Sequence, residues 1–257
     1  MPNNNSHNQH SSSQNNQPRG NQPRGNQPNN NDAIPPYSES GNLGLLYTRR
    51  YYEGLTSDML QKQQEGQTEK ERMKKIEQYF KSRNNNFIGQ GKKPIDSSIL
   101  QPYKSVEREG YKYQEFSLTT TYPGLILGIG LNHGTGLQNE TKLGMDFDHT
   151  TGLPYLPASS VKGVLRAMFR TFIIENHVVA IKEADDLVVT IFGSEHDDNN
   201  HSQGSDIFFD AFPTTAQNGL FGLDYITPHT QGEFANPIPI QFMRILPGVS
   251  FRFSFLL

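Results

Sequence analysis

Apolar and polar residues alternate along several short stretches of this chain, and such alternation is typical of half-buried β-strands. A first strand is predicted over 42–52, where the sequence reads NLGLLYTRRYY. Stronger strand sequence runs from Tyr113 to Tyr122, and a turn at Pro123-Gly124 leads into the next strand. Further strands are predicted over 125–129, 207–211, 239–246 and 249–257.

The principal helix is predicted between Pro157 and about Asn176. Pro157 restricts the residue before it, and Ser159 or Ser160 can cap the first free backbone amides. Apolar residues then recur at the spacing of an amphipathic helix, at Val161, Val164, Leu165, Met168, Phe169 and Phe172. Strands before and after this one helix indicate an α+β fold.

Two other stretches have weaker helical patterns. Residues 55–83 are rich in Gln, Glu and Lys with few apolar positions, so an exposed helix or a helical pair broken near Gly66 is expected there. A loop is predicted over 84–101, because it contains the breakers NNN, GQGKKP and DSS. Residues 182–192 suggest a short helix or turn that ends at Gly193.

Composition divides the chain of 257 residues into a tail and one domain. Residues 1–36 are almost entirely Asn, Gln, Ser, Pro and Gly, with a repeated NQPRG, so we expect a disordered tail. The arginines of the repeat could touch nucleic acid, but a plain flexible tail is the favoured interpretation. The domain is predicted over 37–257, with a helical and loop insertion at 55–100.

Cysteine is absent, which excludes disulfides and thiolate metal sites. The tail lacks the apolar region of a signal peptide, and no stretch is long enough to span a membrane, so a cytoplasmic protein without membrane partners is expected. The net charge of −3 does not favour nucleic-acid binding. However, the acidic residues cluster at 185–186 and 195–198, which is expected to leave the basic face of the principal helix unopposed.

The start of the principal helix is a candidate anion site. Its serine hydroxyls and free amides lie at the positive end of the helix dipole. Lys162, Arg166 and Arg170 are spaced four residues apart, so their charges stack along one face. Three cations in line suit a polyphosphate better than a single carboxylate. The alternative interpretation is a basic face that is merely solvated.

The glycine-rich stretch before this helix has three interpretations. His133 could act as a general base, because its ordinary pKa lies near neutrality. Gly134, Thr135 and Gly136 could bring their amides close to a phosphate. The stretch could also be a plain loop that needs glycine for positive φ.

Asp146, Asp148 and His149 supply two carboxylates and an imidazole within four residues. These groups suit a divalent metal or acid–base chemistry, and on a strand the two aspartates would share a face. No third carboxylate is spaced to complete a metal site, so ordinary acidic loop residues are the favoured interpretation. Asp210 is expected to be structural, because an aspartate at the end of an apolar strand usually caps a neighbouring segment.

The run HTTGLPYLPASSVKGVLR at 149–166 resembles the hallmark G-x-P-x-I-P-x-S-S-x-K-G-x-x-R of the RAMP superfamily of CRISPR effector subunits. Three further stretches resemble the small capping RAMP subunit of the type III-B (Cmr) complex. They are NLGLLYTRRYYEGL at 42–55, DIFFDAFP at 206–213, and LDYITPHT followed by PIPIQFMRIL at 223–246. The resemblance covers about 42–257.

This resemblance implies a ferredoxin-like, RRM-like core with insertions, in a ribonucleoprotein that destroys invading transcripts. It implies a non-catalytic subunit at the end of the backbone that contacts the 3′ part of the guide RNA. The implied partners are guide RNA, target RNA and other Cmr-type backbone and small subunits, with no cofactor or metal. Ser159, Ser160, Lys162 and Arg166 occupy motif positions, and His133 with its glycines matches the family's loop before the motif.

Two alternatives stay open beside a non-catalytic RNA-binding subunit. One is a metal-dependent endoribonuclease that uses Asp146 or Asp148, and the other is a protein–protein cap without RNA contact. The chain also departs from the family pattern, because no glycine-rich loop of the kind G-x-G-x-K-x-x-x-G-x-G occurs before Leu257. We therefore expect that the sequence lacks its carboxyl end.

Overall fold

The computed structural model describes residues 41–60, 68–96, 100, 110–128, 134–142, 144–176, 178, 180–194, 202–227 and 239–257. The chain divides into Met1–Ala33 and Ile34–Leu257, and every described residue belongs to the second unit. The predicted tail over 1–36 lies outside the described residues, as does His133. No helix in the described part is long and apolar enough to cross a membrane.

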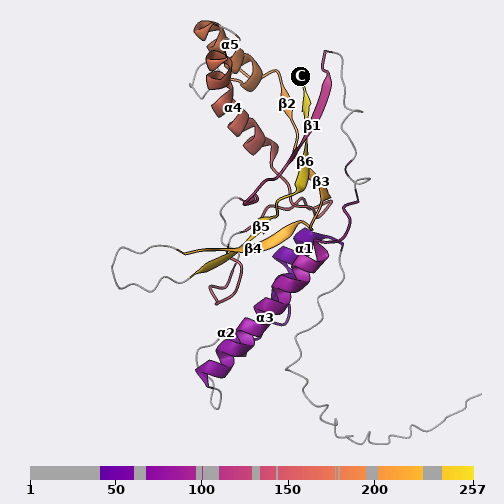
Figure 1. Ribbon diagram of the computed structural model, residues 1–257, viewed down its shortest axis with the longest axis vertical. Helices are drawn as coiled ribbons and strands as arrows, with labels where there is room; N and C mark the ends of the chain where they lie inside the picture. The colour runs from indigo at the N-terminus through magenta and orange to yellow at the C-terminus, as the bar shows by residue number, and fades with distance from the viewer. Residues whose placement is uncertain are drawn as a thin grey trace, which may run out of the picture. The chain divides into compact units, whose positions relative to one another are not determined.

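One strand, β6 (Val249–Leu256), is the centre of the main antiparallel sheet (Figure 1). On one edge it pairs with β1 (Tyr113–Thr119), so that Phe116 lies opposite Phe253. On its other edge it pairs with β2 (Ile207–Phe208) and β3 (Phe212–Ala216). A separate two-stranded sheet joins β4 (Phe221–Ile226) to β5 (Ile240–Ile245). These strands confirm the ones predicted from Tyr113 and over 239–246 and 249–257, and the start of the one over 207–211. The strand predicted over 125–129 is wrong for its described residues, because Leu125 makes only an isolated bridge to Ile245.

The predicted strand over 42–52 is wrong. The segment forms helix α1 (Leu43–Thr48) and a 3₁₀ turn, η1 (Arg50–Tyr52). The Asn42 side chain caps α1 by accepting a hydrogen bond from the Leu45 amide at 2.8 Å. The buried positions Leu43, Leu46, Tyr47 and Tyr51 follow helical spacing, which puts them on one face against the core.

The polar stretch after α2 (Ser57–Leu60) forms one long helix, α3 (Glu69–Gln90), which begins with a capping box between Thr68 and Glu71. Gly66 lies outside the described residues. The helix is not an exposed one, because Ile76, Tyr79, Phe80 and Phe87 are fully buried. It also continues through the NNN run that was predicted to be a loop, since buried Asn84 accepts a 2.7 Å hydrogen bond from the Tyr51 hydroxyl. Tertiary packing therefore outweighs the weak helix propensity of asparagine here.

Helix α4 (Ala158–Glu175) confirms the principal helix, and α5 (Ile181–Phe192) ends at Gly193 as predicted. Gly193 has φ 88°, which favours glycine. Helix α4 follows β1 in the chain and packs on the main sheet through Val161, which clusters with Ala211 and Phe255. Helices combined with an antiparallel sheet confirm the α+β class, and the order β1–β6–β2 with α4 between β1 and β2 fits a ferredoxin-like RAMP domain.

The apolar stripe of α4 is largely uncovered in this structure. Only Val161 and Ile173 are buried among the helix residues, whereas the side chains of Val164, Met168 and Phe172 are 66%, 62% and 60% exposed. A groove beside the stripe is lined by apolar side chains of α4 and the sheet, among them Phe116, Leu118, Val164, Leu165, Phe253 and Phe255. The helix is amphipathic as predicted, but most of its apolar stripe faces outward.

Candidate nucleic-acid interface

The start of α4 is capped from a distant part of the sequence. The Ala158 amide donates a 2.7 Å hydrogen bond to Oδ1 of Asp210, which confirms the structural interpretation of that aspartate. The expectation that Ser159 or Ser160 caps the helix is wrong, because neither hydroxyl makes a capping bond. Asp210 approaches across the bridge between Leu156 and Ala211 and takes that role. Both serine side chains are consequently exposed and uncommitted within the described residues.

One of the three cations in the predicted row forms an ion pair with a neighbouring helix. Lys162 is half-buried, and its ammonium lies 5.9 Å from the centre of the Phe208 ring. Arg166 lies one turn further along α4 and is also half-buried. Arg170 instead forms an ion pair with Asp185 of α5, through Nε and Nη2. The expectation that the acidic cluster leaves this face unopposed is therefore wrong at Arg170, and the hydrogen bond from Arg170 lowers the pKa of Asp185.

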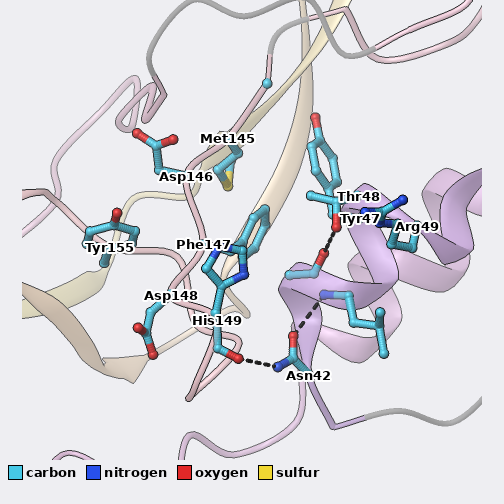
Figure 2. A pocket seen from close by; sticks show the side chains of 13 residues that line it. Asn42, Tyr47, Thr48, Arg49, Met145, Asp146, Phe147, Asp148, His149 and Tyr155 are labelled. Atoms are coloured by element: carbon cyan, nitrogen blue, oxygen red, sulfur yellow. Dashed lines mark hydrogen bonds between the residues drawn. The ribbon is translucent and has the colours of Figure 1, made fainter.

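A cavity of about 650 Å³ lies between α1 and the loop that contains Asp146 and Asp148 (Figure 2). Phe147 makes an isolated bridge to Pro154, and the two flanking aspartates share the side of the cavity on which Tyr155 lies. Thr48 and Arg49 lie on the opposite side. The predicted common face of the two aspartates is thus present without a full strand.

The two carboxylates differ in their surroundings. Oδ2 of Asp148 accepts a 2.6 Å hydrogen bond from the Thr151 amide. Asp146 makes no side-chain hydrogen bond or ion pair within the described residues, and burial raises its pKa. No group of three or more histidines and carboxylates in the described part is arranged to hold a metal ion. The sequence did not point to Arg49 or Tyr155 as members of this site, because only the fold brings them to it.

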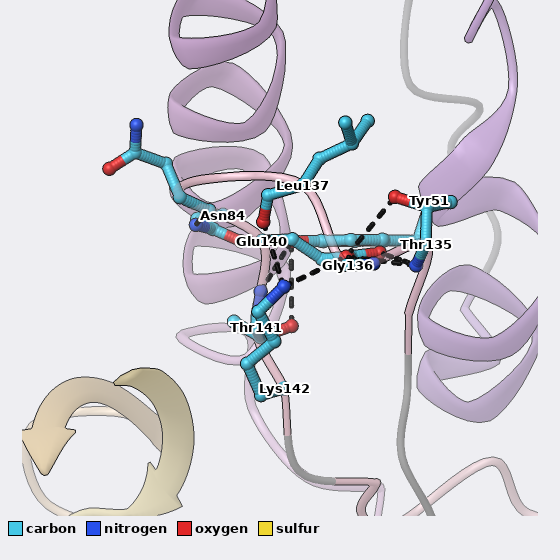
Figure 3. Close-up of polar contacts among 9 residues, drawn as sticks. Tyr51, Asn84, Thr135, Gly136, Leu137, Glu140, Thr141 and Lys142 are labelled. Carbon is cyan, nitrogen blue, oxygen red and sulfur yellow. Dashed lines mark hydrogen bonds and ion pairs between the residues drawn. The ribbon is translucent and has the colours of Figure 1, made fainter. Parts of the chain in front are cut away.

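The glycine-rich loop does cradle an anion, as one interpretation required, but the anion belongs to the chain itself (Figure 3). The Glu140 carboxylate accepts hydrogen bonds from the Thr135 amide at 2.8 and 2.9 Å and from the Gly136 amide at 3.0 Å. A Cβ on Gly134 would meet Oε2 of Glu140 at 2.6 Å. The Lys142 ammonium lies 3.4 Å from Oε2 of Glu140 and forms an ion pair with it. These amides are therefore occupied before any phosphate arrives.

Glu140 belongs to a closed network of polar groups. Its side chain is completely buried, and burial raises the pKa of Tyr51 to about 12. Burial, followed by the neighbouring Glu140 charge, also raises the pKa of Tyr52. The Thr141 amide donates to the Tyr51 hydroxyl at 3.3 Å, which ties the loop to η1. The role of Glu140 was not predicted, although an acidic residue between a glycine-rich turn and Lys142 was the available signal in the sequence.

A model of the RAMP superfamily matches residues 18–228, so the chain belongs to the RAMP superfamily. Among curated proteins, it is 32% identical over 176 residues to the CRISPR system CMR subunit Cmr6 of Saccharolobus solfataricus. That alignment covers 67% of this chain and 54% of the relative, so the chain spans about half of the relative's length.

A solved structure shows the same architecture. It is a chain of the cryo-EM structure of the Type III-B Cmr-beta bound to cognate target RNA, with a TM-score of 0.53 and 25% sequence identity. The match covers 82% of this chain and 72% of the other. The expected family is therefore confirmed, and the narrower resemblance to a small capping subunit stays a prediction.

Proposed function

We propose that this chain is a non-catalytic RNA-binding subunit of a type III-B CRISPR effector, which caps the backbone and contacts the 3′ side of the guide RNA in antiviral defence. Membership of the RAMP superfamily and the likeness to a Cmr subunit support the assembly. The observation that carries the RNA contact is the start of α4. There, Ser159 and Ser160 are exposed, and Lys162 makes no ion pair within the described residues.

The mechanism is electrostatic. The serine hydroxyls donate to phosphate oxygens, and Lys162 and Arg166 supply positive charge over the first two turns of α4. Phosphate contacts of this kind position a strand without reading its bases. That suits an RNA-guided complex, because pairing between guide and target reads the sequence there.

The remaining predicted contacts have a smaller part in the proposal. Gly134, Thr135 and Gly136 are exposed, but their amide hydrogen bonds go to Glu140, so the loop would touch RNA through its outer surface. Arg170 would contact RNA with the N–H groups that Asp185 does not use. His133 stays a predicted contact outside the described residues.

Contact with other Cmr-type subunits is supported by the exposed apolar stripe of α4 and the groove beside it. Contiguous apolar surface of this kind marks protein–protein interfaces. The same observation favours the second candidate, a protein–protein cap without RNA contact. The RNA-binding subunit and the protein–protein cap differ in whether the start of α4, with Lys162 and Arg166, contacts RNA.

The test is retention of guide RNA by the assembled complex. Replacing Lys162 and Arg166 together by alanine is expected to lower guide retention at least tenfold, because two phosphate contacts are lost. Lys182→Ala, on the exposed face of α5, is the matched control and should retain the guide. Normal guide retention by the double variant would leave the protein–protein cap as the better account.

The nuclease alternative has its own test. Asp146→Ala with Asp148→Ala should leave divalent-metal-dependent cleavage of target RNA unchanged in the assembled complex, because no bond is proposed to break at this site. A loss of cleavage with guide retention intact would establish the nuclease instead. Such an enzyme would need further metal ligands from outside the described residues.

A further inference from the structure

Several polar groups on the rim of the cavity beside α1 have no protein partner within the described residues. The side chains of Arg49, Asp146 and His149 and the hydroxyl of Tyr155 make no hydrogen bond or ion pair within the described residues. The wall of the cavity is nevertheless well ordered by packing, because the lining residues Tyr47, Met145 and Phe147 are buried in the core. Asn42 fixes the rim by donating a 3.1 Å hydrogen bond to the His149 carbonyl. Unsatisfied polar groups around a formed cavity indicate a ligand site.

The charges around the cavity select the class of ligand. Asp146 and Asp148 lie on one side, and Arg49 lies on the other (Figure 2). A free polyphosphate would be repelled by the two carboxylates, and the described residues supply no group of three ligands for a metal ion. The complementary molecule carries N–H donors at one end and an anion at the other. A nucleotide has both, since its base presents N–H groups and its phosphate is negative.

We propose that this cavity binds one unstacked nucleotide of an RNA strand, with the base inserted against the apolar back wall. Asp146 accepts hydrogen bonds from the base edge, the exposed His149 ring stacks on the base, and Arg49 pairs with the phosphate. Guanine is the best match, because its N1–H and N2–H₂ donors lie side by side and can both bind one carboxylate. This inference rests on the proposed function for the identity of the strand.

The chain connects the cavity to the α4 site. Tyr155 lines the cavity and stacks on Phe212, and Ala158 begins α4 three residues later. A strand held at Ser159 and Lys162 can therefore present a neighbouring base to the cavity. The raised pKa of Asp146 agrees with this role, since a half-buried carboxylate without a hydrogen-bond partner is poorly solvated until a ligand supplies N–H donors.

The experiment is a titration of the 257-residue chain with guanosine monophosphate or uridine monophosphate, in which binding is monitored by NMR. Wild type is expected to bind the guanine nucleotide at least fivefold more tightly, and Asp146→Asn should lose about tenfold of that affinity. The melting temperature of the Asp146→Asn variant should not fall, because the substitution removes a poorly solvated charge. Asp186→Asn, an exposed carboxylate on α5, is the matched control. Arg49→Gln should remove the preference for the monophosphate over guanosine.

Equal affinity for both nucleotides, or unchanged binding by Asp146→Asn, would overturn the inference. The outcome is separable from that of the proposed function, because the preference for the guanine over the uracil nucleotide depends on the cavity and not on the phosphate site at the start of α4. If guide retention depends on Lys162 and Arg166 and the nucleotides bind alike, only the cavity inference fails. If the guanine nucleotide binds selectively and guide retention is indifferent to the cations, only the proposed function fails.

Discussion

The start of α4 and the glycine-rich loop over 134–136 both have the sequence of an anion site, yet the fold uses them differently. In the loop, the Thr135 and Gly136 amides bind the buried Glu140 carboxylate. At α4, Asp210 takes only the Ala158 amide and leaves the serine hydroxyls exposed. Glycines and free amides in a sequence thus predict an anion without identifying it.

Burial decides which of the two regions can serve an external ligand. A phosphate that entered the loop would have to displace a carboxylate with several charge-assisted hydrogen bonds, which is costly. At the start of α4, the Ser159 and Ser160 side chains are exposed to solvent. The loop therefore stabilises the fold, and the helix start is the element that we propose as the RNA contact.

The largest expected effect concerns the loop. Glu140→Ala should lower the free energy of unfolding by roughly 3–5 kcal/mol, because the Thr135 and Gly136 amides and the Lys142 ammonium lose the buried carboxylate that accepts their hydrogen bonds. Urea unfolding measures the change, and Glu77→Ala, on the exposed face of α3, is the control. A loss below about 1 kcal/mol would mean that the loop does not depend on its internal anion.

A smaller effect is expected at the cap of α4. Asp210→Ala should lower the free energy of unfolding by about 1–2 kcal/mol, the usual value of a lost helix cap. Asp210→Asn keeps an acceptor oxygen and should lose less. Thermal unfolding compares the two variants, and equal losses would show that the acceptor oxygen at position 210 does not stabilise α4.

The smallest effect concerns the pair between Arg170 and Asp185. Asp185→Ala should leave the melting temperature almost unchanged, because exposed ion pairs contribute little. The same substitution frees the Arg170 guanidinium, so affinity for single-stranded RNA should rise roughly threefold. Fluorescence anisotropy with labelled RNA measures this rise. Weaker binding would show that the pair holds α4 in its binding position.

The sequence predicted the elements that have one clear period. Strand β6 alternates cleanly, and α4 has helical spacing behind Pro157, so both were placed correctly. The segment at 42–52 was misassigned because apolar residues in short runs fit either period, and only burial against the core selects the helix. The same holds for α3, in which Asn84 contacts residues far away in the sequence.

The candidate site was predictable where it depends on one helix and not where it depends on contacts between elements. Spacing along α4 placed Lys162 and Arg166 on one face. The partner of Arg170 lies on α5, the cap of α4 comes from Asp210, and Arg49 reaches its cavity from α1. No local pattern could reveal these three relations, because each joins residues far apart in the sequence.

The most direct measurement of the central claim is the salt dependence of RNA binding. For the wild-type chain and for Lys162→Ala with Arg166→Ala, the logarithm of the binding constant for a single-stranded RNA is followed against the logarithm of salt concentration. Loss of two phosphate contacts should reduce the magnitude of the slope by about 1.4. Superimposable slopes and affinities would contradict the assignment of α4 to the RNA backbone.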